Sequence, residues 1–363
     1  MKVQRAILPE TNRVTWLVLG DNFLPIQPIQ SFLTYFQNIE RSPFTIRSYA
    51  FHLKLYWQFL ESTKLDWKKV GLKELSDFVV WLREPHPSGI VAIHERTAKR
   101  TESTVNTMLA SISAFYTYQE RLGVIEPISL HGTLPSHQVG HRGFLHGIAK
   151  SKPAKTRLLK LKATKRIPRT LTPDQLGQLV GACGHLRDKF LLCLLSETGM
   201  RIGQALGLRH EDILSREKII RVIPRDDNAN GARAKTRESN SIHVSVNLMR
   251  LYADYLVDEV QGVRSDYVFI NLWHEPTGQP LTTSSVADIF RRLEKKTGIH
   301  ITPHMLRHTH ATELIRSGWD AALVQKRLGH ASVQTTLNFY THLTDQDLKQ
   351  AFVDHLKKKE MKP

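Results

Sequence analysis

The sequence predicts a mainly α-helical protein of two domains: a four-helix N-terminal domain, and an α+β domain with a small antiparallel sheet. Three observations support this. Apolar residues recur at helical spacing through residues 28–127, two strand-like stretches interrupt the helical pattern of the second half, and a basic segment without Asp or Glu separates the halves. A chain of 363 residues is long enough for two domains that each bury a core.

The N-terminal half is predicted to hold an extension followed by four helices. Residues 1–27 alternate loosely between apolar and polar side chains, which is consistent with a short hairpin. Residues 28–131 form the helical domain, and Ser42-Pro43 is a typical helix start. The expected helices lie near residues 29–36, 43–60, 72–82 and 101–122.

Residues 132–170 differ in composition from both halves and are predicted to be an interdomain linker. The segment carries many Lys and Arg residues and no acidic residue. A charge run is usually only solvated, but one sign over so long a stretch between two folded regions favours contact with a phosphate backbone. The candidate DNA-backbone contacts are Lys150, Lys152, Lys155, Arg157, Lys160, Lys162, Lys165 and Arg166.

The second domain is predicted to span residues 171–363. Thr172 followed by Pro173 marks a helix start, and residues 186–197 form an apolar helix that ends at Thr198-Gly199. Strands are expected at residues 218–223 and 242–246, with turns and a short middle strand in residues 225–240. The remainder is mostly helical.

The composition points to a polyanionic partner. Lys and Arg number 51 against 34 Asp and Glu, which gives a formal charge of +17. An evenly basic surface without a partner is the alternative, and a membrane-surface role lacks any lipidation motif. Two cysteines suggest no disulfide framework, and no signal peptide or spanning stretch is seen. We therefore expect a cytoplasmic, nucleoid-associated protein without membrane contact.

Six residues in the second half form a set that suits phosphoryl transfer onto a tyrosine. Attack on a phosphodiester places negative charge on its equatorial oxygens, which positioned cations stabilise. No suitable carboxylate set for a metal is seen, because Asp226-Asp227 lies in a predicted turn where Asp is common. No metal or other cofactor is therefore expected. The predicted catalytic residues are Arg201, Lys235, His304, Arg307, His330 and Tyr340.

These residues differ in how far the pattern supports them. His304 and Arg307 stand three positions apart, so a helix places both on one face. His304 and His308 could suggest zinc, but the metalloprotease pattern requires Glu where this chain has Met305. Arg201 begins a predicted helix, where an arginine can bind phosphate or can be an ordinary surface residue.

The other three members are supported by context. Lys235 lies in the strand region and could protonate a leaving oxygen, although Arg233 and Arg237 are rivals for a phosphate role. Gly329 permits a sharp turn that exposes His330. A lone tyrosine is usually a packing residue, and Tyr340 gains weight because it follows His330 by ten positions.

The chain resembles the tyrosine recombinases of the phage-integrase family. The resemblance rests on Thr-Gly-Met-Arg-Ile-Gly at 198–203, His-Met-Leu-Arg-His-Thr-His at 304–310, and Leu-Gly-His at 328–330 followed by Phe-Tyr at 339–340. It implies that the N-terminal half is a core-binding domain, and that Arg201 and Arg307 clamp the scissile phosphate. It further implies that His304 and His330 assist proton transfer, Lys235 protonates the leaving 5′ hydroxyl, and Tyr340 is the nucleophile.

The resemblance also implies an activity and partners. The expected function is site-specific recombination or transposition through a 3′-phosphotyrosyl intermediate, on double-stranded DNA, by a homo-oligomer that is a tetramer in synapsis. Other recombinases of the same element are further candidate partners. A type IB topoisomerase-like relaxing enzyme and a catalytically silent DNA-binding accessory protein remain alternatives.

Two features leave questions open. The family often has an acidic residue three positions after the first arginine, where this chain has Gln204, so a tuning role at this position is in doubt. Residues 345–359 carry apolar side chains on one helical face, and this tail could dock on a neighbouring protomer or on its own domain.

Overall fold

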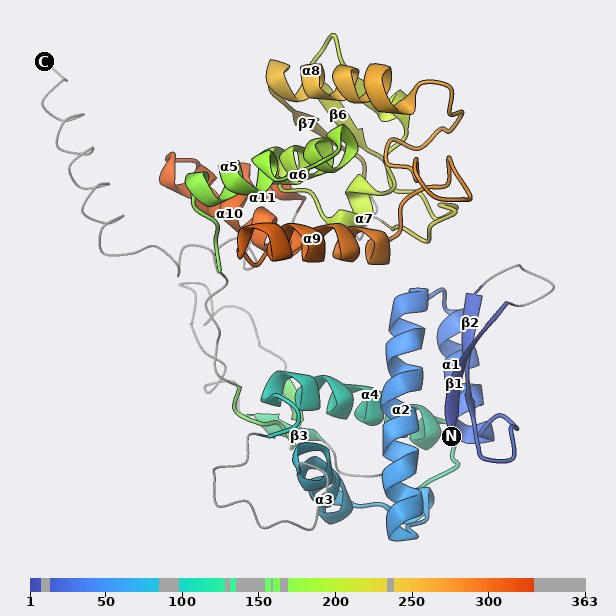
Figure 1. The fold of residues 1–363 in the computed structure, drawn as a ribbon. Helices are drawn as coiled ribbons and strands as arrows, with labels where there is room; N and C mark the ends of the chain where they lie inside the picture. The colour runs from blue at the N-terminus through green and yellow to red at the C-terminus, as the bar shows by residue number, and fades with distance from the viewer. Residues whose placement is uncertain are drawn as a thin grey trace, which may run out of the picture. The chain divides into compact units, whose positions relative to one another are not determined.

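The computed structural model describes residues 1–7, 14–84, 98–127, 131–134, 154–157, 159–163, 169–233 and 238–329. The chain divides into two compact units, Met1–Lys165 and Arg166–Pro363, called here the N-terminal unit and the C-terminal unit (Figure 1). Each unit has its own hydrophobic core. None of the described helices combines the length and the hydropathy needed to span a bilayer.

The N-terminal unit consists of helices and a β-hairpin that packs against one of them. Its apolar periodicity predicts the helices. Its helices are α1 (Gln27–Asn38), α2 (Pro43–Thr63), α3 (Leu72–Arg83) and α4 (Glu102–Arg121), with a short 3₁₀ turn at Trp67–Lys69. Pro43 stands at the start of α2, and the Thr101 hydroxyl caps α4 by accepting from the Thr104 amide. All four predicted helices are confirmed.

The first residues also form the expected hairpin. Strand β1 (Lys2–Ile7) pairs antiparallel with β2 (Val14–Leu19), and both strands contact α2 (Figure 1). Val18 is 1% exposed and belongs to the same core as the helices. The hairpin is therefore part of the N-terminal core.

The predicted linker contains ordered structure. Strand β3 (His131–Leu134) pairs antiparallel with β4 (Ala154–Arg157). Further along, Leu159 and Leu161 pack against the N-terminal core. The Asn106 side chain of α4 donates to the Leu161 carbonyl over 2.9 Å and accepts from its amide over 2.8 Å. This part of the segment is thus fastened to the N-terminal unit.

The C-terminal unit surrounds one central helix. The described elements before its sheet are α5 (Pro173–Gly181), α6 (Leu186–Thr198), α7 (Ile202–Ala205) and the 3₁₀ turn η3 (His210–Asp212). Those after it are α8 (Val246–Tyr255), the π-helical turn η4 (Leu256–Val260), α9 (Thr283–Thr297), α10 (Pro303–Arg316) and α11 (Ala321–Leu328). No residue of helix α6 is exposed, because α6 packs against α8 and α10 and is followed by α7 after the turn at Gly199 (Figure 1).

A three-stranded antiparallel sheet in the order β5-β6-β7 completes this unit. The strands are β5 (Ile213–Leu214), β6 (Ile219–Val222) and β7 (Asn240–His243). The two predicted strands are confirmed, although β7 ends before Val246, which begins α8. In the described part of residues 225–240, only Asn240 belongs to a strand. The third strand is β5, which sequence analysis did not identify.

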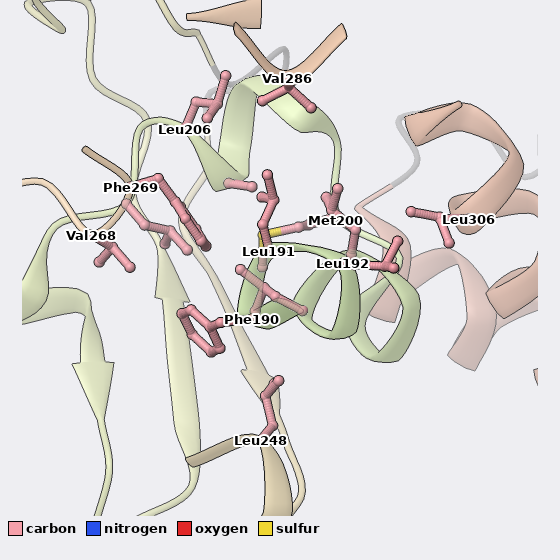
Figure 2. Close-up of a cluster of buried hydrophobic side chains, with 14 of the residues drawn as sticks. Phe190, Leu191, Leu192, Met200, Leu206, Leu248, Val268, Phe269, Val286 and Leu306 are labelled. Carbon is pink, nitrogen blue, oxygen red and sulfur yellow. The ribbon is translucent and has the colours of Figure 1, made fainter. Parts of the chain in front are cut away.

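The core of the C-terminal unit lies beside the segment that carries Arg201. Figure 2 shows Phe190, Leu191 and Leu192 of α6 close to Met200, and Leu306 of α10 on the other side. Met200 is 2% exposed and Leu306 is fully buried. These two apolar residues precede Arg201 and Arg307 directly, so core packing fixes the main chain beside each arginine.

Candidate active site

The structure describes three of the six predicted catalytic residues, which are Arg201, His304 and Arg307. Lys235, His330 and Tyr340 lie outside the described residues. Among the DNA-backbone candidates, Lys160 and Lys162 are described and exposed, and Lys155 and Arg157 are described only as part of β4. The remaining candidates, Lys150, Lys152, Lys165 and Arg166, also lie outside the described residues.

Arg201 is placed by the corner between α6 and α7. Helix α6 ends at Gly199, whose φ of +61° is the left-handed conformation that favours glycine. The Thr198 hydroxyl donates to the Leu194 carbonyl over 2.6 Å and accepts from the Met200 amide over 3.3 Å, which fixes the turn. Arg201 is then the N-cap residue of α7.

Gln204 caps this helix start. Its side-chain Oε1 accepts from the Arg201 amide over 2.8 Å, and the residue is 7% exposed. An amide can perform this capping without a charge, since only an acceptor is needed. The departure from the acidic residue therefore preserves the local geometry and removes one negative charge beside the arginine.

Arg307 is buried near the start of α10. The Thr302 hydroxyl caps this helix by accepting from the Met305 amide over 3.2 Å, and Pro303 occupies its first position. Arg307 is 6% exposed and donates from Nη1 to the Gly199 carbonyl over 2.7 Å and from Nη2 to the Leu328 carbonyl over 2.8 Å. Two carbonyls from different parts of the chain thus orient one guanidinium.

Arg201 and Arg307 also lie close enough to affect each other's charge. Burial, followed by the nearby charge of Arg201, lowers the pKa of Arg307 to about 9. Burial also lowers the pKa of Arg201, which donates from Nη1 to the Gly329 carbonyl over 3.3 Å. Within the described residues, no Asp or Glu carboxylate lies within 4.0 Å of either guanidinium. Two neighbouring cations held by neutral carbonyls form a site suited to an anion.

His304 lies in the first turn of α10, three residues before Arg307, and is exposed. The helix therefore offers an accessible imidazole next to a buried guanidinium, as the spacing predicts. Asp226 and Asp227, the carboxylate pair that the sequence analysis considered for a metal, lie near arginines: Asp226 is 3.7 Å from Arg233 and Asp227 is 3.3 Å from Arg209.

The chain that leads to Lys235 is held against α7. A Cβ atom on Gly203 would lie 2.6 Å from the main-chain oxygen of Arg233, so only glycine permits this approach. The Asn230 side chain donates to the carbonyls of Leu206 (3.0 Å) and Leu281 (2.8 Å). The stem before residues 234–237 is therefore fixed to the helix that Arg201 begins.

Sequence analysis missed the groups that hold the arginines. The carbonyls of Gly199, Leu328 and Gly329 carry no sequence signature, although glycine after an apolar helix did signal each helix end. His310 and Arg327 were also missed. Arg327 donates from Nε to Nε2 of His310 over 3.1 Å, and His310 is 6% exposed. The position of His310 in the motif, six residues after His304, gave no hint of this contact.

Comparison with known proteins agrees with this arrangement. Residues 169–347 match the phage integrase family, and residues 29–123 match the N-terminal SAM-like domain of phage integrases. Transposase A from transposon Tn554 of Staphylococcus aureus is 44% identical over 363 residues, the full length of both chains. Tyrosine recombinase XerD of Halalkalibacterium halodurans is 28% identical over 341 residues, which cover 89% of this chain and 95% of the relative.

Solved structures show the same fold. The Tn1549 transposon integrase in complex with a circular intermediate DNA aligns over 90% of this chain and 99% of its own, with a TM-score of 0.61 and 16% identity. The XerH site-specific recombinase bound to a palindromic difH substrate aligns over 85% of this chain and 79% of its own, with a TM-score of 0.58 and 20% identity. The paired arginines, their spacing in the sequence and the full-length relative lead to the same conclusion: the chain belongs to the phage integrase family of tyrosine recombinases.

Proposed function

We propose that this chain is the site-specific recombinase of a mobile element, a transposase that cleaves and rejoins DNA through a 3′-phosphotyrosyl intermediate. The observation that carries the proposal is the Arg201–Arg307 pair, two adjacent cations without a described carboxylate partner. A scissile phosphate supplies the missing negative charge, and the Tn554 transposase relative indicates the kind of element.

In the proposed reaction, the Tyr340 oxygen attacks the phosphorus and the 5′ oxygen of the next nucleotide leaves. Arg201 and Arg307 bind the non-bridging oxygens, where negative charge develops, and His304 and His330 assist through hydrogen bonds and proton transfer. Lys235 gives a proton to the leaving oxygen. The phosphodiester is exchanged for a phosphotyrosyl ester, so a 5′ hydroxyl of a partner strand can reverse the step without an energy source.

The nucleophile is tested with Tyr340→Phe on a nicked suicide substrate that traps the covalent product. We expect the variant to bind DNA with wild-type affinity and to form no adduct, because phenylalanine has no oxygen to attack phosphorus. Wild-type protein is the positive control, and the adduct is mapped by peptide mass spectrometry. Adduct formation by Tyr340→Phe would falsify the assignment.

We also propose that the segment after β4 contacts the DNA backbone. Leu159 and Leu161 pack against the N-terminal core while Lys160 and Lys162 are exposed, so the alternation along this segment presents both cations outward. The N-terminal unit would then act as the core-binding domain, and the basic segment would add sequence-independent affinity.

Lys160→Gln combined with Lys162→Gln tests this contact. We expect weaker DNA binding and a salt dependence whose log–log slope is smaller by about 2, because each lost phosphate contact removes about one released counterion. Lys2→Gln with Lys73→Gln is the charge-matched control on the same unit. An unchanged slope for the linker variant would show that the segment is only a tether.

Strand exchange between two sites requires several protomers, so we propose a homo-oligomer that is tetrameric in synapsis. Residues 345–359, whose apolar side chains share one helical face, are the proposed docking segment. Removing residues 345–363 is expected to impair the pairing of two DNA sites more than binding to one site, as native gel electrophoresis would measure. Normal pairing by the truncated chain would exclude docking on a neighbour.

A further inference from the structure

The end of α11 is the part of the C-terminal unit that holds both arginines. Four consecutive main-chain carbonyls there accept hydrogen bonds from side chains. The Asn240 Nδ2 donates to Lys326 (3.3 Å) and Arg327 (3.4 Å), Arg307 donates to Leu328, and Arg201 donates to Gly329. The last carbonyls of a helix lack partners within the helix and carry the negative end of its dipole. The helix end is therefore the electrostatic counterpart of the arginine pair.

Arg327 fixes this helix end to the rest of the unit. Its guanidinium donates to Nε2 of His310 in α10 over 3.1 Å, to the His243 carbonyl in β7 over 3.2 Å, and to the Glu197 carbonyl in α6 over 3.1 Å. One side chain thus connects α11 to three other elements. Because Leu328 and Gly329 follow Arg327 directly, its anchoring sets where their carbonyls lie.

His310 supports the same frame from the opposite side. A Cβ atom on Gly199 would lie 2.7 Å from Cδ2 of His310 and 2.7 Å from Cδ2 of Leu328, so these two side chains close around the turn. The Gly199 carbonyl in that turn is the second acceptor for Arg307. His310 is thereby in position to fix both the α6–α7 corner and the Arg327 side chain.

The contact with Arg327 requires an imidazole with a free lone pair on Nε2. Burial, followed by the charges of Arg327 and Arg307, lowers the pKa of His310 to about 4. At neutral pH the ring is uncharged, and Nε2 can accept the Arg327 proton. The geometry and the protonation state therefore agree.

We propose that His310 and Arg327 are positioning residues for strand transfer. Through the carbonyls of Gly199, Leu328 and Gly329 they hold Arg201 and Arg307 at the separation that two non-bridging phosphate oxygens require. The inference rests on the proposed function, because the reaction supplies the phosphate. Neither residue needs to touch DNA.

The test compares single-turnover cleavage by His310→Leu and His310→Gln. His310→Leu removes the acceptor and replaces the ring with an apolar side chain, and we expect cleavage to slow about 100-fold because small displacements of catalytic groups have effects of this size. The Kd for DNA should change less than about twofold, since the groups that bind the flanking backbone are unaltered. His310→Gln retains an acceptor oxygen and is expected to recover most of the rate. His300→Leu, at an exposed histidine of the same unit, is the matched control.

Two readouts separate positioning from a general loss of structure. In an Arg307→Ala background, His310→Leu should slow cleavage by only about twofold more, because the group that it positions is already gone. On DNA with a neutral methylphosphonate at the scissile position, the His310→Leu penalty should shrink at least about tenfold, since less negative charge needs to be met. A simple folding defect would leave both penalties unchanged.

Arg327→Gln gives the same measurement from the other partner if His310→Leu does not fold, as judged by circular dichroism. The proposal is overturned if the folded variants cleave at the wild-type rate, if their penalties persist undiminished without Arg307, or if DNA binding falls in parallel with cleavage. Failure of the wild-type chain to form a Tyr340 adduct would instead overturn the proposed function and this inference with it. The two failures are distinguished by the wild-type reaction.

Discussion

The cores of the two units differ in which side chains they bury. The N-terminal unit relies on aromatic rings: Phe115 packs edge-to-face with Phe32 and Trp57, at centroid distances of 5.6 and 5.7 Å. Its buried polar residues are Thr15, Ser111 and Gln119, none of which carries a charge. Within the described residues, this core therefore buries no charged side chain.

The C-terminal unit buries charges. Arg187 contacts Asp188 over 2.7 Å, and Asp212, fully buried, contacts Arg225 over 2.7 Å. Arg307 differs because its acceptors within the described residues are neutral carbonyls. A buried cation without a counter-charge reduces stability, so its presence indicates a requirement other than folding. The comparison indicates that the core of the first unit serves stability, whereas the second unit accepts the unfavourable burial of Arg307 because its site requires that cation.

The substitution with the largest expected effect tests whether the two cores are independent. Phe115→Ala should lower the free energy of unfolding of the N-terminal unit by about 4 kcal/mol, because a fully buried ring in an aromatic cluster is removed. Hydrogen exchange read by mass spectrometry follows each unit separately, and α6 should keep its protection. Phe23→Ala, at a side chain that is 78% exposed, is the control. Equal loss of protection in α6 would show that the units fold as one.

A smaller effect tests the close packing inside the C-terminal unit. Gly203→Ala places a methyl group 2.6 Å from the Arg233 carbonyl oxygen and should destabilise this unit by about 2 kcal/mol, because main chain must move. Gly177→Ala in α5 meets nothing within 4 Å and should stabilise by about 0.5–1 kcal/mol, since alanine is the better helix former. Denaturant titration measures both. A Gly203→Ala variant as stable as wild type would contradict the tight contact.

A third test, with an expected effect similar in size to that of Gly203→Ala, concerns acid. His310 has a folded pKa near 4 against about 6.5 unfolded, so the unfolded chain takes up its proton first as the pH falls. Its contribution is complete above pH 6.5 and is lost as pH falls toward 4, which amounts to about 2 kcal/mol between pH 7 and pH 5. Denaturation midpoints of wild type and His310→Gln across this range give the difference. Parallel curves would show that His310 is not buried as a neutral ring.

Local signals made much of the fold predictable. Pro43 and Thr172 stand at the helix starts where capping chemistry places them, and the helical periodicity identified the N-terminal helices. Arg201 and Arg307 were identified from short motifs, and the structure brings both to the same helix end. The assignments of Lys235, His330 and Tyr340 stay predictions, because these residues lie outside the described part of the chain.

Non-local pairing was harder to predict. Strand β3 pairs with β4 across 19 intervening residues inside a segment whose composition indicated only a linker, because pairing depends on a partner and not on local propensity. A short middle strand was expected within residues 225–240, of which residues 234–237 lie outside the described part of the chain. Strand β5, which the sequence did not indicate, has two residues and is too short to give an alternating pattern. The main-chain acceptors for the arginines could not be predicted from the sequence either, since every residue carries a carbonyl.

The neutral cap at Gln204 has a consequence for how the site responds to its surroundings. A carboxyl group at this position would gain and lose a proton, and with it the local field on the neighbouring guanidinium would change. A primary amide does not titrate, so the Oε1 contact with the Arg201 amide persists at any pH that the fold tolerates. Gln204 therefore adds no pH dependence of its own to the electrostatic attraction that this corner offers to an incoming phosphodiester, and any acid or alkaline limit on turnover must originate in other residues.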